Sequence, residues 1–228
     1  MIKNNISILC SGLVALALVG CSQMPVNQAA PLTNTLHAGI IQEPIIAYFS
    51  EDAGLLAEEG CIISGYSSTP VKGGFYRKLL GRNSLGYFLA QDFYQDSDKP
   101  QSSPFWVKDV EGLNSFDSTY VEGPITGYYQ NGKMSFESHY QDGEPIGTQK
   151  FYYNNGQLAY TDIIKDSIIY AKYWYENGRP AAEIHFGVDD EEFNPKGQIW
   201  DQQGQAITDQ TQRIQTLYDI EKKVNSQK

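Results

Sequence analysis

Aromatic and polar residues alternate around three Asn-Gly pairs in the second half of the chain. The stretches read YYQNG at 128–132, YYNNG at 152–156 and WYENG at 174–178. Alternation on both sides of a turn signal is typical of two antiparallel strands joined in a hairpin. Asn-Gly is the strongest short hairpin signal, because a type I′ turn needs a positive φ at both central residues. Each stretch therefore predicts a β-hairpin with a two-residue loop.

The hairpins belong to a sequence repeat. Residues 112–127 and 132–147 are identical at seven of their 16 positions. Glycines open successive units at Gly112, Gly132, Gly156, Gly178 and Gly204. This spacing indicates one supersecondary unit that is stacked on copies of itself. Gly86 is the candidate start of a degenerate earlier unit, because FYQD at 93–96 is similar to HYQD at 139–142.

The two-residue loop assigns residues to the two faces of the sheet. It pairs Gln130 with Lys133, Tyr129 with Met134 and Tyr128 with Ser135. A longer loop would shift this pairing but leave the alternation within each strand. The face predicted to be buried contains Tyr129, Met134, Phe136, Tyr140, Phe151, Tyr153, Leu158, Tyr160, Ile164, Tyr173, Tyr175, Ile184 and Phe186.

The opposite face is predicted to carry a half-exposed stripe of aromatic rings. Tyr128, Tyr152, Trp174 and Trp200 lie there, opposite Ser135, Ala159, Ala181 and Ile207. Lys150 falls opposite Thr161, and Lys172 falls opposite Glu183 as a cross-strand ion pair. We predict a surface for a protein partner from Tyr128, Tyr152, Trp174, Lys150, Lys172, Glu137 and Glu183. The alternative is that the rings only cover the smaller residues opposite and stabilise the sheet.

The N-terminus predicts export and a lipid anchor. Lys3 precedes an apolar run from Ile6 to Val19, which is too short for a comfortable membrane-spanning helix. The run ends in LVGC at 18–21, which resembles the lipobox of bacterial lipoproteins. The resemblance implies that residues 1–20 are a signal peptide, that Cys21 is acylated, and that the protein lies in the cell envelope. Ser22 after the cysteine favours the outer membrane facing the periplasm, and surface exposure remains open.

The remaining segments frame the repeats. Residues 21–42 are a polar tether, 43–104 a β-rich cap, 105–207 the hairpin repeats and 208–228 a C-terminal helix. A short helix is expected between Ser50 and Gly60, and Ile214, Leu217, Tyr218 and Val224 give the last segment its helical spacing. The predicted fold is therefore mainly β, with stacked antiparallel hairpins in one extended sheet, a short N-terminal helix and a C-terminal helix.

The repeat motif is similar to the bacterial MORN-repeat variant family. YYQNGKMSFESHYQDG at 128–143 fits the family pattern, whereas the next unit has Thr161 in place of its glutamate. The resemblance implies a non-catalytic module that binds a protein or a glycan. It also leaves open a second function, that of an immunity or antitoxin-type lipoprotein that neutralises a toxin.

Composition and motifs limit the partners and the chemical activities that we expect of this chain. Without residues 1–20 the chain has a formal charge of −11, which disfavours nucleic acid as a partner. No sequence motif of a hydrolase, a phosphate loop or a dinucleotide site is present, so we expect neither catalysis nor a cofactor. His139 and His185 occupy equivalent repeat positions too far apart for one zinc ion, and the acids at 189–192 lack calcium-loop spacing.

Cys61 is expected to be a buried, unpaired thiol, with intermolecular pairing as the alternative.

Overall fold

The computed structural model describes residues 43–54, 65–190 and 192–226. Within them the chain forms one thirteen-stranded antiparallel sheet and a C-terminal helix, α1 (Gln210–Ser226). The strands of the first half are β1 (Ile45–Phe49), β2 (Tyr66–Ser67), β3 (Phe75–Arg82), β4 (Phe88–Tyr94) and β5 (Phe105–Val107). The remaining strands are β6 (Val121–Tyr128), β7 (Met134–Gln141), β8 (Glu144–Pro145), β9 (Gln149–Tyr152), β10 (Leu158–Lys165), β11 (Ile168–Trp174), β12 (Pro180–Gly187) and β13 (Lys196–Ile199).

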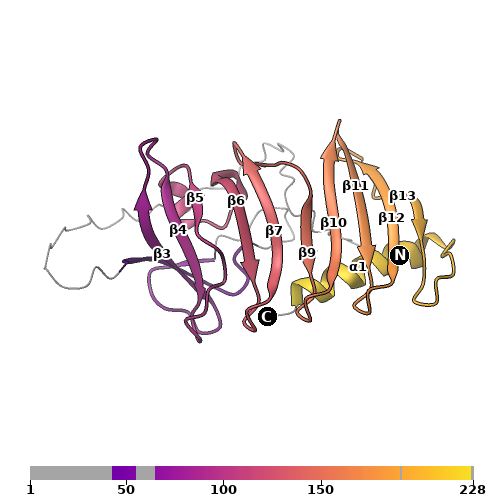
Figure 1. The fold of residues 1–228 in the computed structure, drawn as a ribbon, viewed down its shortest axis with the longest axis horizontal. Coiled ribbons are helices and arrows are strands. Elements are labelled where there is room, and N and C mark those ends of the chain that lie inside the picture. Colours follow the sequence, from indigo (N-terminus) through magenta and orange to yellow (C-terminus); the bar gives the residue numbers. More distant parts are fainter. Residues whose placement is uncertain (1–42, 55–64, 191, 227–228) are drawn as a thin grey trace, which may run out of the picture.

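The strands lie side by side almost in chain order. The sheet runs β13-β12-β11-β10-β9-β7-β6-β5-β4-β3-β1-β2, and β8 pairs with β7 beside this path. Figure 1 shows the resulting row of hairpins, with α1 crossing behind the C-terminal half. The prediction of a mainly β protein with one extended hairpin sheet and a C-terminal helix is confirmed. The helix expected from Ser50 to Gly60 falls largely on residues 55–64, outside the described residues, and Glu51–Gly54 form a turn.

The loops of the repeat hairpins have three residues and not two. Tyr129 N donates to Lys133 O, and Gly132 N donates to Tyr129 O, each at 2.8 Å. In each Asn-Gly pair only the glycine has a positive φ. This pattern is that of a type I turn followed by a glycine bulge, so the type I′ prediction is wrong. The asparagine side chain serves the turn instead: Asn131 Oδ1 accepts a bond from Lys133 N at 2.9 Å.

Each hairpin also contains a bulge next to its loop. Tyr128 lies opposite Met134, but Gly127 lies opposite Phe136, so Ser135 between them has no partner. The corresponding residues of the next two hairpins are Ala159 and Ala181. The second strand of each hairpin thus has one extra, unpaired residue. This bulge lies close to a loop that is itself one residue longer than predicted.

The bulge changes which residues face solvent. Met134, predicted to be buried, shares the face of Tyr128 and is 40% exposed. Leu158 lies opposite Tyr152 in the same way. The predicted partners of the outer aromatic rings are therefore wrong: the rings of Tyr128, Tyr152, Trp174 and Trp200 face Met134, Leu158, Pro180 and Ala206. Beyond the bulge the predicted core residues Phe151, Tyr160, Tyr173 and Ile184 are buried.

The second ring of each aromatic pair links its hairpin to the next one. Tyr153 Oη donates to Trp174 O at 2.9 Å, and Tyr175 Oη donates to Trp200 O at 2.6 Å. The same bond joins Tyr94 to Tyr128 O and Tyr129 to Tyr152 O. Burial raises the pKa of Tyr94 to about 12 and raises the pKa of the other three hydroxyls as well, so all four stay protonated donors.

Successive turns are also linked directly. Asn131 Nδ2 donates to Asn154 O at 2.7 Å, and Asn155 Nδ2 donates to Glu176 O at 3.2 Å. Basic side chains make similar bonds from Lys99 to Gln130 O, from Lys133 to Asn155 O and from Arg179 to Gln202 O. Together with the tyrosine bonds, these bonds fix the spacing of the hairpins at the strand ends that carry the Asn-Gly turns.

Helix α1 covers one face of the sheet, which we term the inner face. Asp209 Oδ1 caps the helix by accepting a bond from Gln212 N at 2.9 Å. The buried side chains of the helix are Leu217, Ile220, Glu221 and Val224, which join the core formed by β9 to β13. Tyr218, predicted to belong to the apolar face of the helix, is 38% exposed, and Ile220 and Glu221 lie against the sheet instead.

Residues 109–120 pack beside the N-terminal half of the sheet. They contain two short 3₁₀ helices, Glu111–Asn114 and Ser118–Tyr120, so the repeat unit predicted to open at Gly112 is not a hairpin. A Cβ at Gly112 would lie 2.4 Å from the Cβ of Tyr120 and 2.6 Å from a methyl of Val107. The glycine therefore permits close packing here, whereas the glycines of the Asn-Gly loops permit a positive φ.

Candidate functional site

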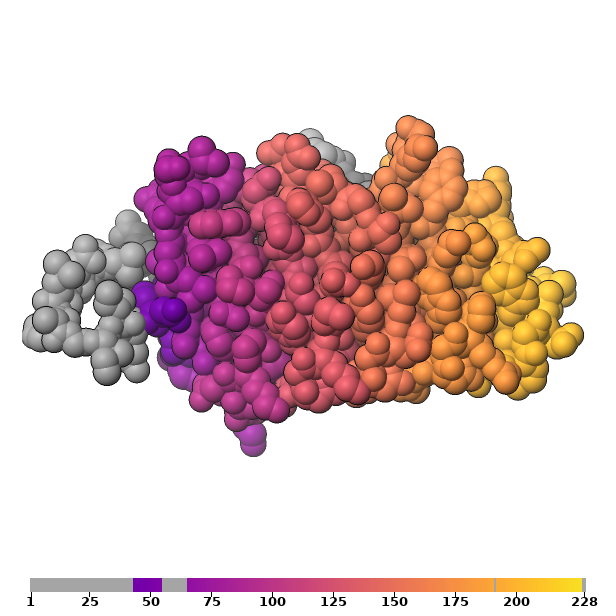
Figure 2. Space-filling view, in the orientation of Figure 1, coloured from indigo at the N-terminus to yellow at the C-terminus, as the bar shows by residue number. Residues whose placement is uncertain are grey.

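The face opposite α1, which we term the outer face, is open in the repeat region. Within the described residues, α1 packs on the other side of β9 to β13. Figure 2 has the orientation of Figure 1, and residues of the strands form the visible surface while α1 lies behind them. The sheet therefore has one protected face and one face that is available for contact.

A row of charged residues crosses the middle of the outer face. Glu137, Lys150, Thr161, Lys172 and Glu183 lie opposite one another in turn on β7, β9, β10, β11 and β12. Lys172 Nζ lies 3.0 Å from Glu183 Oε1, at the register that the sequence predicts. Lys150 Nζ lies 3.3 Å from Glu137 Oε2. The row thus presents an acid at each end and two lysines between them.

Glu137 is held as an anion by its neighbours. The Tyr152 hydroxyl donates a hydrogen bond to Glu137 Oε2, which Lys150 also contacts. The tyrosine bond, with Lys150 beside it, holds the pKa of Glu137 below its ordinary value. Burial and the carboxylate together raise the pKa of Tyr152 to about 12. These contacts fix the orientation of the Tyr152 ring on the outer face.

Apolar and aromatic side chains flank the charged row on both sides. Tyr128, Tyr152 and Trp174 are all half-buried on the side of the Asn-Gly turns. On the other side, which was not predicted, Ile163 lies opposite Tyr170, and Tyr170 stacks on His185 at 5.9 Å between ring centres. Tyr170 is 45% exposed. Its position two residues before Lys172 was the available signal, since residues two apart in a strand share a face.

The structure brings the seven predicted surface residues onto one face, and the residues that it describes form no metal site. His139 and His185 lie on β7 and β12, four strand spacings apart, which is about 19 Å in a flat sheet. Asp190 accepts a hydrogen bond from Gly187 N at 2.9 Å and so closes a turn. Among the described residues no group of three histidine, cysteine or acidic side chains could hold a metal ion. Cys21 and Cys61 lie outside the described residues.

The fold defines a repeat protein of stacked β-hairpins. Residues 121–142 and 145–166, which lie in β6 to β10, match the MORN repeat variant family. No curated protein and no solved structure matches the chain. In the part of the chain that the structure describes, no helix has both the length and the apolar character needed to cross a membrane.

Proposed function

We propose that this chain is a non-catalytic binding module, anchored to a membrane of the bacterial cell envelope through Cys21, that holds a protein partner on its outer face. The anchor is supported by the lipobox-like LVGC at 18–21. The binding role is supported by the MORN-variant repeats, because repeat proteins of this type present extended surfaces for contact.

One observation carries the proposal. The outer face combines oriented aromatic rings, exposed apolar residues and a fixed row of charges, while the inner face already has its cover. Aromatic anchors surrounded by polar residues are the composition of an interface centre. The charged row sets the orientation in which a partner can bind. A complementary partner surface has basic groups opposite the two ends of the row and acidic groups opposite its middle.

Photo-crosslinking tests the outer face directly. A photoreactive phenylalanine analogue at Tyr170 should capture the partner in cells, whereas the same analogue at Tyr218 on α1 should not. The two tyrosines are matched, since they are 45% and 38% exposed and differ in the face they occupy. Mass spectrometry identifies the captured protein, and a basic toxin in that position would support the immunity function instead.

The double variant Tyr152→Ser and Trp174→Ser should abolish the crosslink at Tyr170 while leaving the fold intact. Removing two half-buried rings from a contact surface typically costs several kcal/mol of binding free energy. Circular dichroism and thermal melting measure the fold separately. Capture at wild-type yield by the folded double variant would remove the outer face from consideration, and a collapse of the melting temperature would assign the rings to stability.

The anchor has its own test. Intact mass measurement of the mature protein should show acyl chains on Cys21, and Cys21→Ala should accumulate as an unacylated precursor. A lipid chain binds membranes in proportion to its buried methylene groups, so the wild-type protein should fractionate with membranes. A wild-type chain that is fully soluble and carries no acyl mass would contradict the anchor and leave the outer face untouched.

A further inference from the structure

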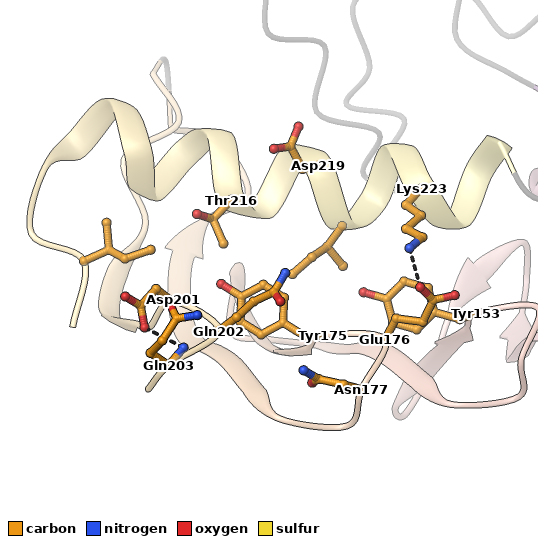
Figure 3. Close-up of a pocket in the computed structure, with 12 residues that line it drawn as sticks. Tyr153, Tyr175, Glu176, Asn177, Asp201, Gln202, Gln203, Thr216, Asp219 and Lys223 are labelled. Carbon is orange, nitrogen blue, oxygen red and sulfur yellow. Dashed lines mark hydrogen bonds and ion pairs between the residues drawn. The ribbon is translucent and has the colours of Figure 1, made fainter. Parts of the chain in front are cut away.

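A polar groove runs between α1 and the last two turns of the sheet. It has a volume of about 600 Å³, within the range of small-molecule sites. Tyr153 and Tyr175 line it from the sheet and Ile220 lines it from α1, while the turns around Asn177 and Gln202 form one wall. Figure 3 shows α1 as the other wall, with Lys223 and Glu176 meeting at one end of the groove. The groove lies beside the inner face, so it is separate from the outer face.

The groove opens where the links between successive turns are incomplete. Asn131 and Asn155 each donate their side-chain amide to a carbonyl of the next turn. Asn177 has the same place in its own turn, and its Oδ1 accepts a bond from Arg179 N at 3.0 Å. Its Nδ2, however, has no hydrogen-bond partner among the described residues. In the following turn the carbonyl at the place of Asn154 O and Glu176 O is Gln202 O, and it accepts a bond from Arg179 Nη1 at 2.6 Å instead.

Further unused groups line the same space. The side-chain amides of Gln202 and Gln203 make no hydrogen bond within the part of the chain that the structure describes. Asp201 Oδ1 accepts bonds from Gln203 N and Gln205 N, while Oδ2 accepts none from the described residues. In Figure 3, Gln202 extends toward α1. Asp219 on α1 also lines the groove, and its Oδ1 accepts a bond from Gln215 Nε2 at 2.8 Å. The groove therefore offers several amide donors and acceptors and the carboxylate groups of Asp201 and Asp219.

This set of groups selects a chemical class of ligand. Glu176 and Lys223 form an ion pair, so neither charge is free to hold a charged ligand. Asp201 and Asp219 disfavour an anion and can accept bonds from hydroxyl groups, and no group of three described histidine, cysteine or acidic side chains could hold a metal ion. An apolar ligand would leave the three amides unpaired. Hydroxyl groups both donate and accept, which matches an equal supply of amide N–H and C=O groups.

We propose that the groove binds a neutral oligosaccharide. Sugar hydroxyls bond to the amides of Asn177, Gln202 and Gln203 and to Asp201 Oδ2. The C–H face of a sugar ring packs on the apolar atoms of Tyr175, Ile207 and Ile220. The proposal is independent of the outer face, since a sugar in the groove touches none of the residues that would contact a protein there.

Titration calorimetry of the purified full-length protein tests the proposal with maltotriose, cellotriose and triacetylchitotriose as probes. At least one trisaccharide should bind with one site per chain. Asn177→Asp keeps the oxygen that supports the turn and deletes the amide donor, so it should weaken binding at least tenfold, as should Gln202→Ala. Asn131→Asp, the same change two turns earlier and outside the groove, should bind like wild type.

Sedimentation with insoluble cellulose or chitin separates a free sugar from a glycan chain as the natural source. Binding of the trisaccharides alone assigns a free sugar, and cosedimentation assigns a glycan chain. Failure of all three trisaccharides to bind would overturn the proposal. Wild-type affinity in both Asn177→Asp and Gln202→Ala would overturn it equally, even if a sugar binds elsewhere on the protein.

Discussion

Replacing Asp92 by alanine should lower the free energy of unfolding by about 3–5 kcal/mol. Asp92 accepts two bonds from Arg77, Nε to Oδ1 at 2.7 Å and Nη2 to Oδ2 at 2.8 Å. Both residues are 2% exposed. The variant leaves the guanidinium buried among aromatic rings, with backbone carbonyls as its remaining partners, as Nη1 donates to Gly112 O at 2.7 Å. Chemical denaturation of the wild type and the variant measures the loss.

The repeat half of the sheet supplies a matched control. Lys172 and Glu183 are also opposite each other on neighbouring antiparallel strands, but their side chains are 56% and 64% exposed. Glu183→Ala should therefore cost less than about 1 kcal/mol, because water and salt screen an exposed pair. Equal losses for Asp92→Ala and Glu183→Ala would show that the pair at Arg77 is not desolvated as the structure has it.

The second large effect is a loss of stability with rising pH that depends on Glu221. This carboxyl group lies beneath α1, accepts a bond from Tyr173 Oη at 2.6 Å and is 7% exposed. Burial raises the pKa of Glu221 from 4.5 to about 7, and Asp162 nearby contributes to the rise. Burial also raises the pKa of Asp162 to about 7.

The folded protein therefore binds a proton at Glu221 that the unfolded chain releases near pH 4.5. The stabilising effect of the protonated form is complete below the unfolded pKa and is lost as the pH rises through the folded value. The loss between pH 4.5 and 8 should amount to about 3 kcal/mol from this group. Glu221→Gln keeps an oxygen for Tyr173 and removes the titrating group, so its loss of unfolding free energy over the same range should be smaller by about this amount. The rest of the loss comes from Asp162, which the variant retains.

Denaturation of the two proteins at a series of pH values checks this. Near pH 8 Glu221→Gln should be the more stable protein, because the wild type must keep a carboxylate under the helix. Glu183→Gln, an exposed position on the outer face, should follow the wild-type curve. Parallel curves for wild type and Glu221→Gln would show that the acid is not protonated in the folded state at low pH.

The repeat, the sheet and the open face were accessible from sequence because they depend on local patterns. Asn-Gly marks the loops, and alternation marks the faces. The prediction that Lys172 lies opposite Glu183 held although the loop length was wrong. The loop has one residue more than predicted, the bulge at Ala181 adds one residue to the opposite strand, and the two errors cancel beyond the bulge.

The features that sequence could not supply depend on long-range packing. Arg77 and Asp92 lie in unremarkable polar positions, and the segment around Gly112 that covers them was interpreted as part of a repeat. The burial of Glu221 was not predicted, because a charged residue in a helix is ordinarily exposed. Asn177 indicates a turn, but neither Asn177 nor Asp201 indicates a groove in the sequence. The groove between them exists only because α1 packs across the sheet.

The return of α1 couples the length of this helix to the number of hairpins. The helix reaches from Arg213, which donates a bond to Gly197 O in β13, to Val224, whose carbonyl accepts a long bond from Tyr129 Oη. A chain that gained one whole hairpin would lengthen its sheet by about 10 Å without disturbing any turn. Its helix would then need about six or seven further residues to cover the new strands. Duplication of a hairpin in this fold is therefore viable only with a matching extension of the C-terminus, and the length of α1 acts as a molecular ruler for the array.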